Sequence, residues 1–175
     1  ETYFLKLGAY FEQADHQVSY FGMDDEKNTV GNAYGLYTQN MDFHSSKIQR
    51  FLYPFKILYS LDAYRKMKKL IRMFHPDVIH LNNINFQLTP SIIDAAWKAG
   101  VPVIQTVHDS QMVCPGHLLY RPSTGQLCQR CVKGSKWNCV RYRCIHGSFV
   151  KSLLGSMEGI LYSWKRNYDR VQLYI

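Results

Sequence analysis

The chain has 175 residues, which is enough for one domain with a hydrophobic core. Hydrophobic residues make up 46% of it, which excludes a disordered chain, and no apolar run is long enough to cross a bilayer. The formal net charge of +8 favours anionic partners: nucleic acid, phosphorylated substrates or an acidic membrane surface.

The first part of the chain gives weak signals of secondary structure. Residues 2–14 place Phe4, Leu7 and Phe11 at helical spacing and predict a helix. Residues 17–22 alternate between polar and apolar side chains and predict a strand. Residues 23–46 have no clear period and predict a long loop.

Residues 54–74 predict a long amphipathic helix. Its apolar stripe consists of Ile57, Leu61, Tyr64, Met67, Ile71 and Phe74. The opposite face carries four basic residues, Arg65, Lys68, Lys69 and Arg72. Such a face is often simply solvated, but it would also suit acidic lipid headgroups.

Two short β-branched runs, residues 78–81 and 101–107, flank a helix that Thr89-Pro90 opens and Gly100 closes. This order predicts parallel strands buried by helices on both faces of a sheet. Ligands in such sheets bind beyond the carboxyl ends of the strands. The polar residues at these ends are His80, Asn82, Asn83, His108 and Asp109.

The end of the chain predicts a last helix over residues 149–164 and a strand over residues 171–175. The apolar stripe of this helix is expected to pack on the sheet and consists of Val150, Leu153, Leu154, Met157, Ile160, Leu161 and Trp164. Strands that alternate with helices indicate the α/β class.

Residues 109–147 form a cysteine-rich segment with little periodicity. Cys128, Cys131, Cys139 and Cys144 have the spacing C-x2-C-x7-C-x4-C, which suits a tetrahedral structural zinc site. Reduced cysteines without metal, or disulfides formed after purification, are the alternatives. Cys114 precedes a proline and is expected to be a packed loop residue.

Four segments together resemble the N-terminal domain of family 4 glycosyltransferases with the GT-B fold. The opening ETYFLKLGAYFEQADHQVSYFGM is similar to the family's first helix and second strand. PDVIHLNN (residues 76–83) and GVPVIQTVHDSQMVCP (residues 100–115) are similar to two family phrases, although Asn82 replaces a histidine of the first. YDRVQLYI (residues 168–175) resembles the strand that enters the interdomain linker.

The resemblance implies one Rossmann-like N-terminal domain over residues 1–175, with residues 109–147 as a cysteine-rich insert that some members share. It also implies a first strand with a glycine-rich loop before Glu1 and a C-terminal domain after Ile175. Most of the nucleotide-sugar would bind in that second domain. The fragment alone is therefore expected to be inactive.

The implied activity is retaining transfer of a sugar from a nucleotide-sugar donor to a polysaccharide or lipid-linked acceptor. His108 is the predicted catalytic residue, because the histidine of this phrase contacts the reacting sugar in the family. An imidazole there can donate a hydrogen bond as charge develops. Catalysis in this fold needs no metal, so zinc would be structural. The alternative is a histidine that only bonds a loop.

The neighbouring residues have two interpretations each. Asp109 could orient His108 or cap its own loop. His80, Asn82 and Asn83 could bind acceptor hydroxyls, or the two asparagines could simply favour a turn.

A zinc-knuckle-like nucleic-acid-binding module is the alternative function, because basic residues and Trp137 surround the cysteines. Zinc knuckles, however, use a shorter spacing and a histidine ligand, so no nucleic-acid partner is expected. A metal phosphohydrolase would need more carboxylates. No signal peptide is visible, which favours a cytoplasmic chain, peripheral on the inner membrane face through Arg65, Lys68, Lys69 and Arg72.

Overall fold

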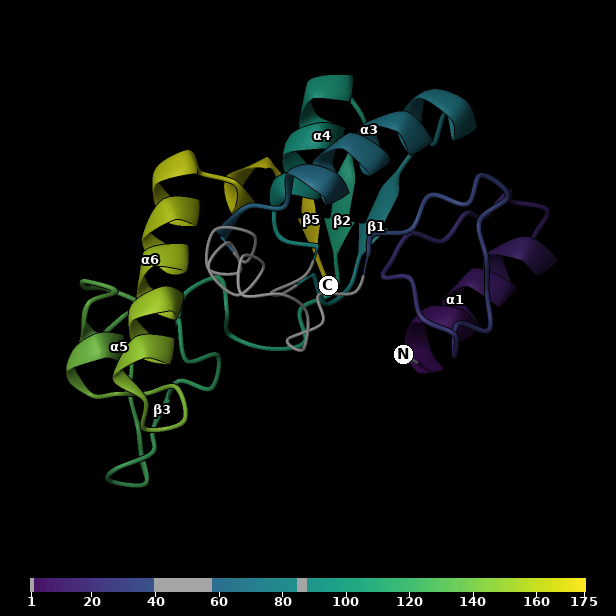
Figure 1. Cartoon of the computed structure of the whole chain (residues 1–175). Coiled ribbons are helices and arrows are strands. Elements are labelled where there is room, and N and C mark those ends of the chain that lie inside the picture. The colour runs from purple at the N-terminus through teal and green to yellow at the C-terminus, as the bar shows by residue number, and fades with distance from the viewer. Residues whose placement is uncertain (1, 40–57, 85–87) are drawn as a thin grey trace.

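A three-stranded parallel sheet forms the centre of the molecule (Figure 1). The computed structural model describes residues 2–39, 58–84 and 88–175. The strands are β1 (Ile79–Leu81), β2 (Val103–Gln105) and β5 (Leu173–Tyr174), in the order β1-β2-β5. Both pairs are parallel, with Leu81 opposite Gln105 and Gln105 opposite Tyr174. The predicted α/β class with a parallel sheet is confirmed.

Helices α3 (Leu61–Phe74) and α4 (Ser91–Ala99) pack on each other and enclose the hydrophobic core with the sheet. The core includes Met67, Ile71, Leu81, Ile92, Ile93 and Val103. On the second face of the sheet, His80 and Ile104 lie opposite each other and are half-buried. Within the described residues, the predicted helix packing is therefore evident on one face.

The start of α3 differs from the prediction, which placed it at residue 54; residues 54–57 lie outside the described residues. Ser60 is the N-cap, and its side chain accepts a hydrogen bond of 3.2 Å from the backbone N–H of Ala63. Leu61 is 56% exposed, whereas Ala63 and Leu70 join the buried face. The predicted stripe was wrong at Leu61 because that residue lies in the first turn, at the edge of the core.

Helix α4 begins and ends where the sequence predicted. Pro90 precedes it, and Gly100 ends it in the left-handed conformation that glycine adopts without strain. The Thr89 hydroxyl accepts a hydrogen bond from the backbone N–H of Ser60, at 3.1 Å. This bond joins the start of α4 to the start of α3.

The N-terminal helix α1 (Thr2–Gln13) confirms the prediction, but the strand expected at residues 17–22 does not form. A single parallel bridge between Met23 and Thr38 stands in its place. The ring of Tyr20 instead packs edge-on against Phe4, with centroids 5.4 Å apart. Tyr20 therefore packs on α1, whereas Phe21 packs against the core next to the sheet, and neither lies in a strand.

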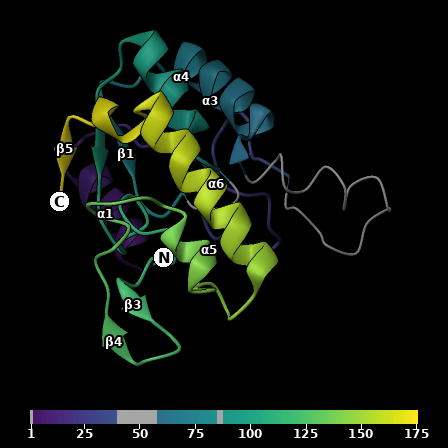
Figure 2. The same ribbon diagram turned by 90° about the vertical axis from the view of Figure 1, so that its left-hand side faces the viewer.

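Helix α6 (Phe149–Lys165) has the predicted bounds but not the predicted packing. Its buried residues are Ser152, Gly155, Ser156, Glu158 and Tyr162. The predicted stripe is half-buried or exposed, and Trp164 is 79% exposed. α6 lies beside the short helix α5 (Asn138–Arg141) (Figures 1 and 2).

Small residues explain this inversion of α6. A Cβ atom at Gly155 would lie 2.5 Å from Ile145 Cδ1, so a larger residue there would require the Ile145 side chain to shift. The Ser152 hydroxyl accepts from the Ile145 N–H at 3.1 Å, and the Ser156 hydroxyl donates to the Lys136 carbonyl at 2.9 Å. The cysteine-rich segment, which also forms the hairpin β3 (Tyr120–Arg121) and β4 (Gln126–Leu127), thus occupies one face of α6.

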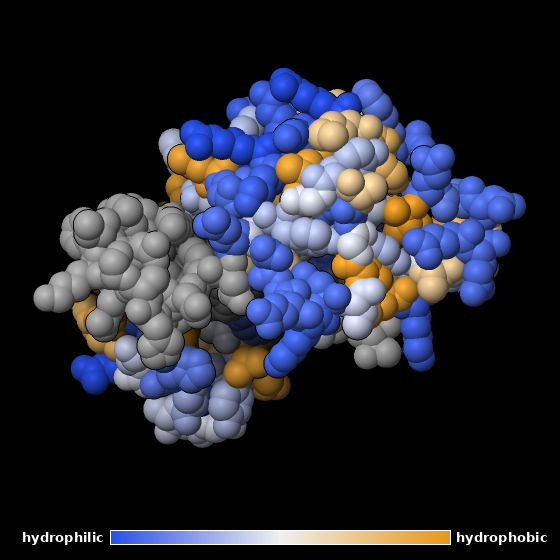
Figure 3. Space-filling view, turned by 45° about the vertical axis from the view of Figure 1, so that its right-hand side comes forward, coloured by the Kyte–Doolittle hydropathy of each residue, from blue (hydrophilic) through white to orange (hydrophobic). Residues whose placement is uncertain are grey.

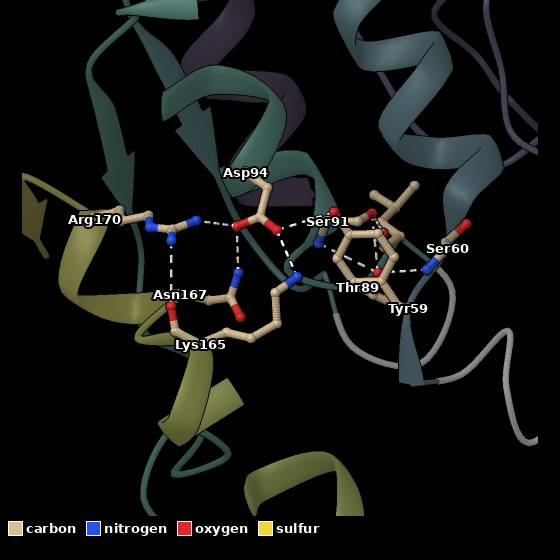
Figure 4. A network of polar contacts seen from close by, with 9 residues as sticks. Tyr59, Ser60, Thr89, Ser91, Asp94, Lys165, Asn167 and Arg170 are labelled. Carbon is tan, nitrogen blue, oxygen red and sulfur yellow. Dashed lines mark hydrogen bonds and ion pairs between the residues drawn. The ribbon is translucent and has the colours of Figure 1, made fainter. Parts of the chain in front are cut away.

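A buried carboxylate, Asp94 of α4, holds the C-terminal part of the chain (Figure 4). It pairs with Lys165 at 2.8 Å and with Arg170 of the short helix η1 (Tyr168–Arg170). Asn167 and Tyr59 donate two further hydrogen bonds to it, at 2.5 and 2.9 Å. This network connects α4 to the end of α6, and no sequence pattern predicted it.

No helix in the described ranges combines the length and the apolar character that crossing a membrane requires.

Candidate functional site

The predicted strand-end residues come together in a pocket at the carboxyl edge of the sheet. The pocket is lined by Asn82, Asn83, Gln105, Thr106, Val107, His108, Asp109, Gln111 and Met112. Four of the five predicted residues therefore line it, and His80 is the exception.

His108 and Asn82 face each other across the pocket from the loops that follow β2 and β1. The imidazole Nε2 lies 3.2 Å from the amide Oδ1 of Asn82. With an N–H on Nε2, the ring donates to this oxygen, and the contact is exposed enough for a ligand to reach. The residue that replaces the family's histidine thus orients His108.

His80 does not line the pocket, but it contacts Thr106, which does. Its Nε2 lies 2.8 Å from the hydroxyl of Thr106, and the ring is half-buried. Burial lowers the pKa of His80 and favours the neutral imidazole. The geometry gives its predicted role in acceptor binding no support.

Asp109 caps its own loop, which is one of its two predicted roles. Its Oδ1 accepts from the backbone N–H of Gln111 at 2.9 Å. Its Oδ2 lies 3.3 Å from Nδ1 of His117. Burial lowers the pKa of His117, and the Asp109 carboxylate opposes this shift.

His117 was not singled out by the sequence analysis. It lies in a loop without periodicity, and its left-handed backbone (φ 64°) is not visible in the sequence. The structure brings it to the pocket loop through Asp109, so it helps to hold that loop in place.

Glu158 of α6 is a second residue that the sequence analysis missed. It is 4% exposed, and its Oε1 accepts from Nε2 of Gln111 at 3.2 Å. Burial raises its pKa from the ordinary value of 4.5 to about 7, and the hydrogen bonds from Tyr162 and Gln111 oppose the shift. Gln111 lines the pocket, so this bond connects the pocket loop to α6.

Glu158 is expected to make the stability of the protein depend on pH. A folded-state pKa above the ordinary value means that the folded chain binds the proton more tightly. This contribution is complete below about pH 4.5 and is lost as pH rises through about 7. The loss amounts to about 3 kcal/mol. Urea unfolding of Glu158→Gln between pH 5 and 8 should therefore show a flatter profile than the wild type.

The exposed Glu26 supplies a matched control for this measurement. Glu26→Gln should leave the pH profile as in the wild type. Equal slopes for Glu158→Gln and the wild type would contradict the assignment.

All five cysteines line a second, small cavity. They are free thiols, and burial together with neighbouring sulfurs raises the pKa of Cys131 to about 11 and of Cys139 to about 12. Among the described residues, no three histidine, cysteine or carboxylate side chains are already placed to hold a metal ion. Cys114 lines the same cavity as the four predicted ligands, which the sequence did not indicate.

Structural zinc at Cys128, Cys131, Cys139 and Cys144 therefore stays a prediction. Elemental analysis of protein purified under reducing conditions should find one zinc per chain, because the four thiols can converge on this cavity. The double variant Cys131→Ser, Cys139→Ser should lose the metal, whereas Cys114→Ser should keep it. A metal-free wild-type chain would leave the cysteines as packing residues.

The chain was compared with protein families, curated proteins and solved structures. The model for Glycosyltransferase Family 4 matches residues 1–140. No curated protein and no solved structure gave a match. The family match includes α1, the sheet strands β1 and β2 and the loop that carries His108. The chain therefore belongs to glycosyltransferase family 4.

Proposed function

We propose that the chain is the acceptor-side domain of a retaining glycosyltransferase, which transfers a sugar from a nucleotide-sugar to a polysaccharide or lipid-linked acceptor. The family match supports glycosyl transfer as the activity. The pocket that joins the loops after β1 and β2 supports the location of the site. The family match gives the nucleic-acid alternative no support.

The observation that carries the proposal is His108, held by Asn82 in an accessible pocket. Glycosyl transfer develops positive charge at the anomeric carbon and negative charge on the leaving diphosphate. An imidazole N–H placed at the sugar can stabilise a partly charged oxygen in this state. Asp109 and His117 act indirectly, because they hold the loop that carries His108.

The donor is expected to bind mainly to the C-terminal domain that the resemblance implies, and the reaction to need no metal. The test is a nucleotide-release assay of the whole protein with UDP-glucose, UDP-galactose, UDP-N-acetylglucosamine and GDP-mannose. Release of UDP or GDP from one of them supports the proposal. The absence of release from all four would contradict it.

We also propose that the basic face of α3 binds an anionic membrane from the cytoplasmic side. Arg65, Lys68, Lys69 and Arg72 are all exposed. The side of the molecule in Figure 3 is largely hydrophilic, with separate hydrophobic patches. An anionic leaflet attracts each nearby basic residue by about 1 kcal/mol.

Charge reversal on this face is expected to release the protein from anionic vesicles. Lys68→Glu, Lys69→Glu and Arg72→Glu together should lower the partition coefficient onto phosphatidylglycerol vesicles by about 100-fold or more. Co-sedimentation with the vesicles measures this coefficient. A control with the same charge change elsewhere is Lys133→Glu, Arg141→Glu and Arg143→Glu, all exposed in the cysteine-rich segment. Equal losses in both variants would indicate net charge alone and exclude a specific face.

A further inference from the structure

Two buried polar atoms in the strand-end pocket have no hydrogen-bond partner among the described residues. They are Oε1 of Gln105 and Nδ2 of Asn82. Gln105 is 7% exposed, and both residues line the pocket that contains His108. A buried polar atom without a partner is destabilising, and folded proteins contain few of them. The presence of these two unpaired atoms in one pocket therefore indicates a role in binding, because they do not stabilise the fold.

The two atoms belong to residues at the ends of neighbouring strands, and they are complementary. Gln105 ends β2 and is opposite Leu81 in the register, and Asn82 follows Leu81 directly. The Gln105 oxygen is a hydrogen-bond acceptor, and the Asn82 amide nitrogen is a hydrogen-bond donor. The other side-chain atom of Asn82, Oδ1, already faces His108. A group bound between the two free atoms would thus lie next to the imidazole.

We propose that Gln105 and Asn82 bind one hydroxyl group of a sugar substrate. A hydroxyl both donates and accepts, so it can donate to Gln105 Oε1 and accept from Asn82 Nδ2. This inference rests on the proposed function for its substrate class. It makes Gln105 a specificity-determining residue, because a sugar that lacks this hydroxyl would leave both atoms unpaired.

A second glutamine of the pocket, Gln111, serves as the control for Gln105. Gln111 is 8% exposed and lines the same pocket, but its amide nitrogen donates to Glu158. Replacement of either glutamine by methionine conserves the length of the side chain and removes the polar atoms. The two variants differ in whether a native hydrogen bond is lost.

The first measurement is the thermal stability of the whole chain without substrate. Gln105→Met should raise Tm by about 2 °C or more, because it removes an unpaired buried oxygen. Gln111→Met should lower Tm, because it leaves Glu158 without that donor. A fall of Tm for Gln105→Met would show that Gln105 is a structural residue and would overturn the inference.

The second measurement is the nucleotide-release assay of the whole protein with the four nucleotide-sugars named above. Gln105→Met should lower kcat/KM at least tenfold. If release without acceptor is affected, the hydroxyl belongs to the transferred sugar. If only transfer to methyl glycoside acceptors is affected, the hydroxyl belongs to the acceptor. Either result supports the site.

The His108→Ala variant separates the two proposals. Loss of activity in His108→Ala with unchanged activity in Gln105→Met would contradict the hydroxyl site, whose atoms would then bind only water, and would leave the proposed function intact. Wild-type activity in both variants would remove the hydroxyl site and the catalytic role of His108, whereas glycosyl transfer as the activity would stand.

Discussion

His108→Ala is expected to lower kcat for sugar transfer by about 10²- to 10⁴-fold, the range found when a positioned proton donor or a hydrogen bond to developing charge is removed. The ring is exposed to the pocket and its one described hydrogen bond, at 3.2 Å to Asn82, is a surface contact. The free energy of unfolding should therefore change little. Nucleotide release and urea unfolding of the whole protein measure the two effects.

The exposed histidine after α1 provides the control for this experiment. His16→Ala should retain wild-type kcat. A His108→Ala enzyme with near-normal turnover would exclude His108 as the catalytic residue. A variant that is inactive because it unfolds would be recognised by its loss of cooperative unfolding in urea.

Asp94→Asn is expected to lower the free energy of unfolding by about 3 kcal/mol, because it leaves the charges of Lys165 and Arg170 beside a neutral amide. Asp94 is 4% exposed, and the side chains of its two cationic partners are about three quarters buried, at 27% and 24% exposed. For a chain of this size, Tm should fall by about 6–12 °C. Thermal unfolding followed by circular dichroism measures this change.

A surface pair in the same region serves as the matched control. Asp169 and Arg166 form an ion pair whose side chains are 57% and 77% exposed. Asp169→Asn should change the free energy of unfolding by less than about 0.5 kcal/mol, because exposed pairs are screened by water. Similar effects of the two substitutions would show that the Asp94 network does not stabilise the joint between α4 and the C-terminal segment.

Much of the site could be predicted because its residues follow strands with strong local signals. Thr89-Pro90 and Gly100 delimit α4, and the apolar runs before His80 and His108 identify β1 and β2. Parallel strands place their carboxyl ends at one edge, so the loops after them meet. Asn82, Asn83, His108 and Asp109 accordingly line one pocket.

The residues that the sequence analysis missed owe their roles to side-chain contacts that local sequence patterns do not show. Glu158 reaches Gln111 across 47 positions of the chain, and His117 reaches Asp109 from a loop. Gln105 was predicted only as part of a buried strand, and the structure shows that its side-chain oxygen is buried without a partner.

Helix α6 shows the limit of periodicity most clearly. The hydropathy pattern correctly predicted a helix, yet its small and polar face is buried and its apolar stripe is half-buried or exposed. Periodicity describes the faces of one helix, whereas burial depends on which neighbour fits. Here Gly155 and two serines fit the cysteine-rich segment.

By itself, the sequence determined the parallel α/β architecture, the bounds of α4 and α6 and the strand-end position of His108, because capping residues and hydrophobic runs act over a few residues. Only the tertiary structure decided which face of α6 is buried, that Asp94 binds two cations, that five cysteines share a cavity and that Gln105 lines the same pocket as Asn82. These features depend on shape and charge complementarity between segments far apart in the chain, which local patterns do not encode.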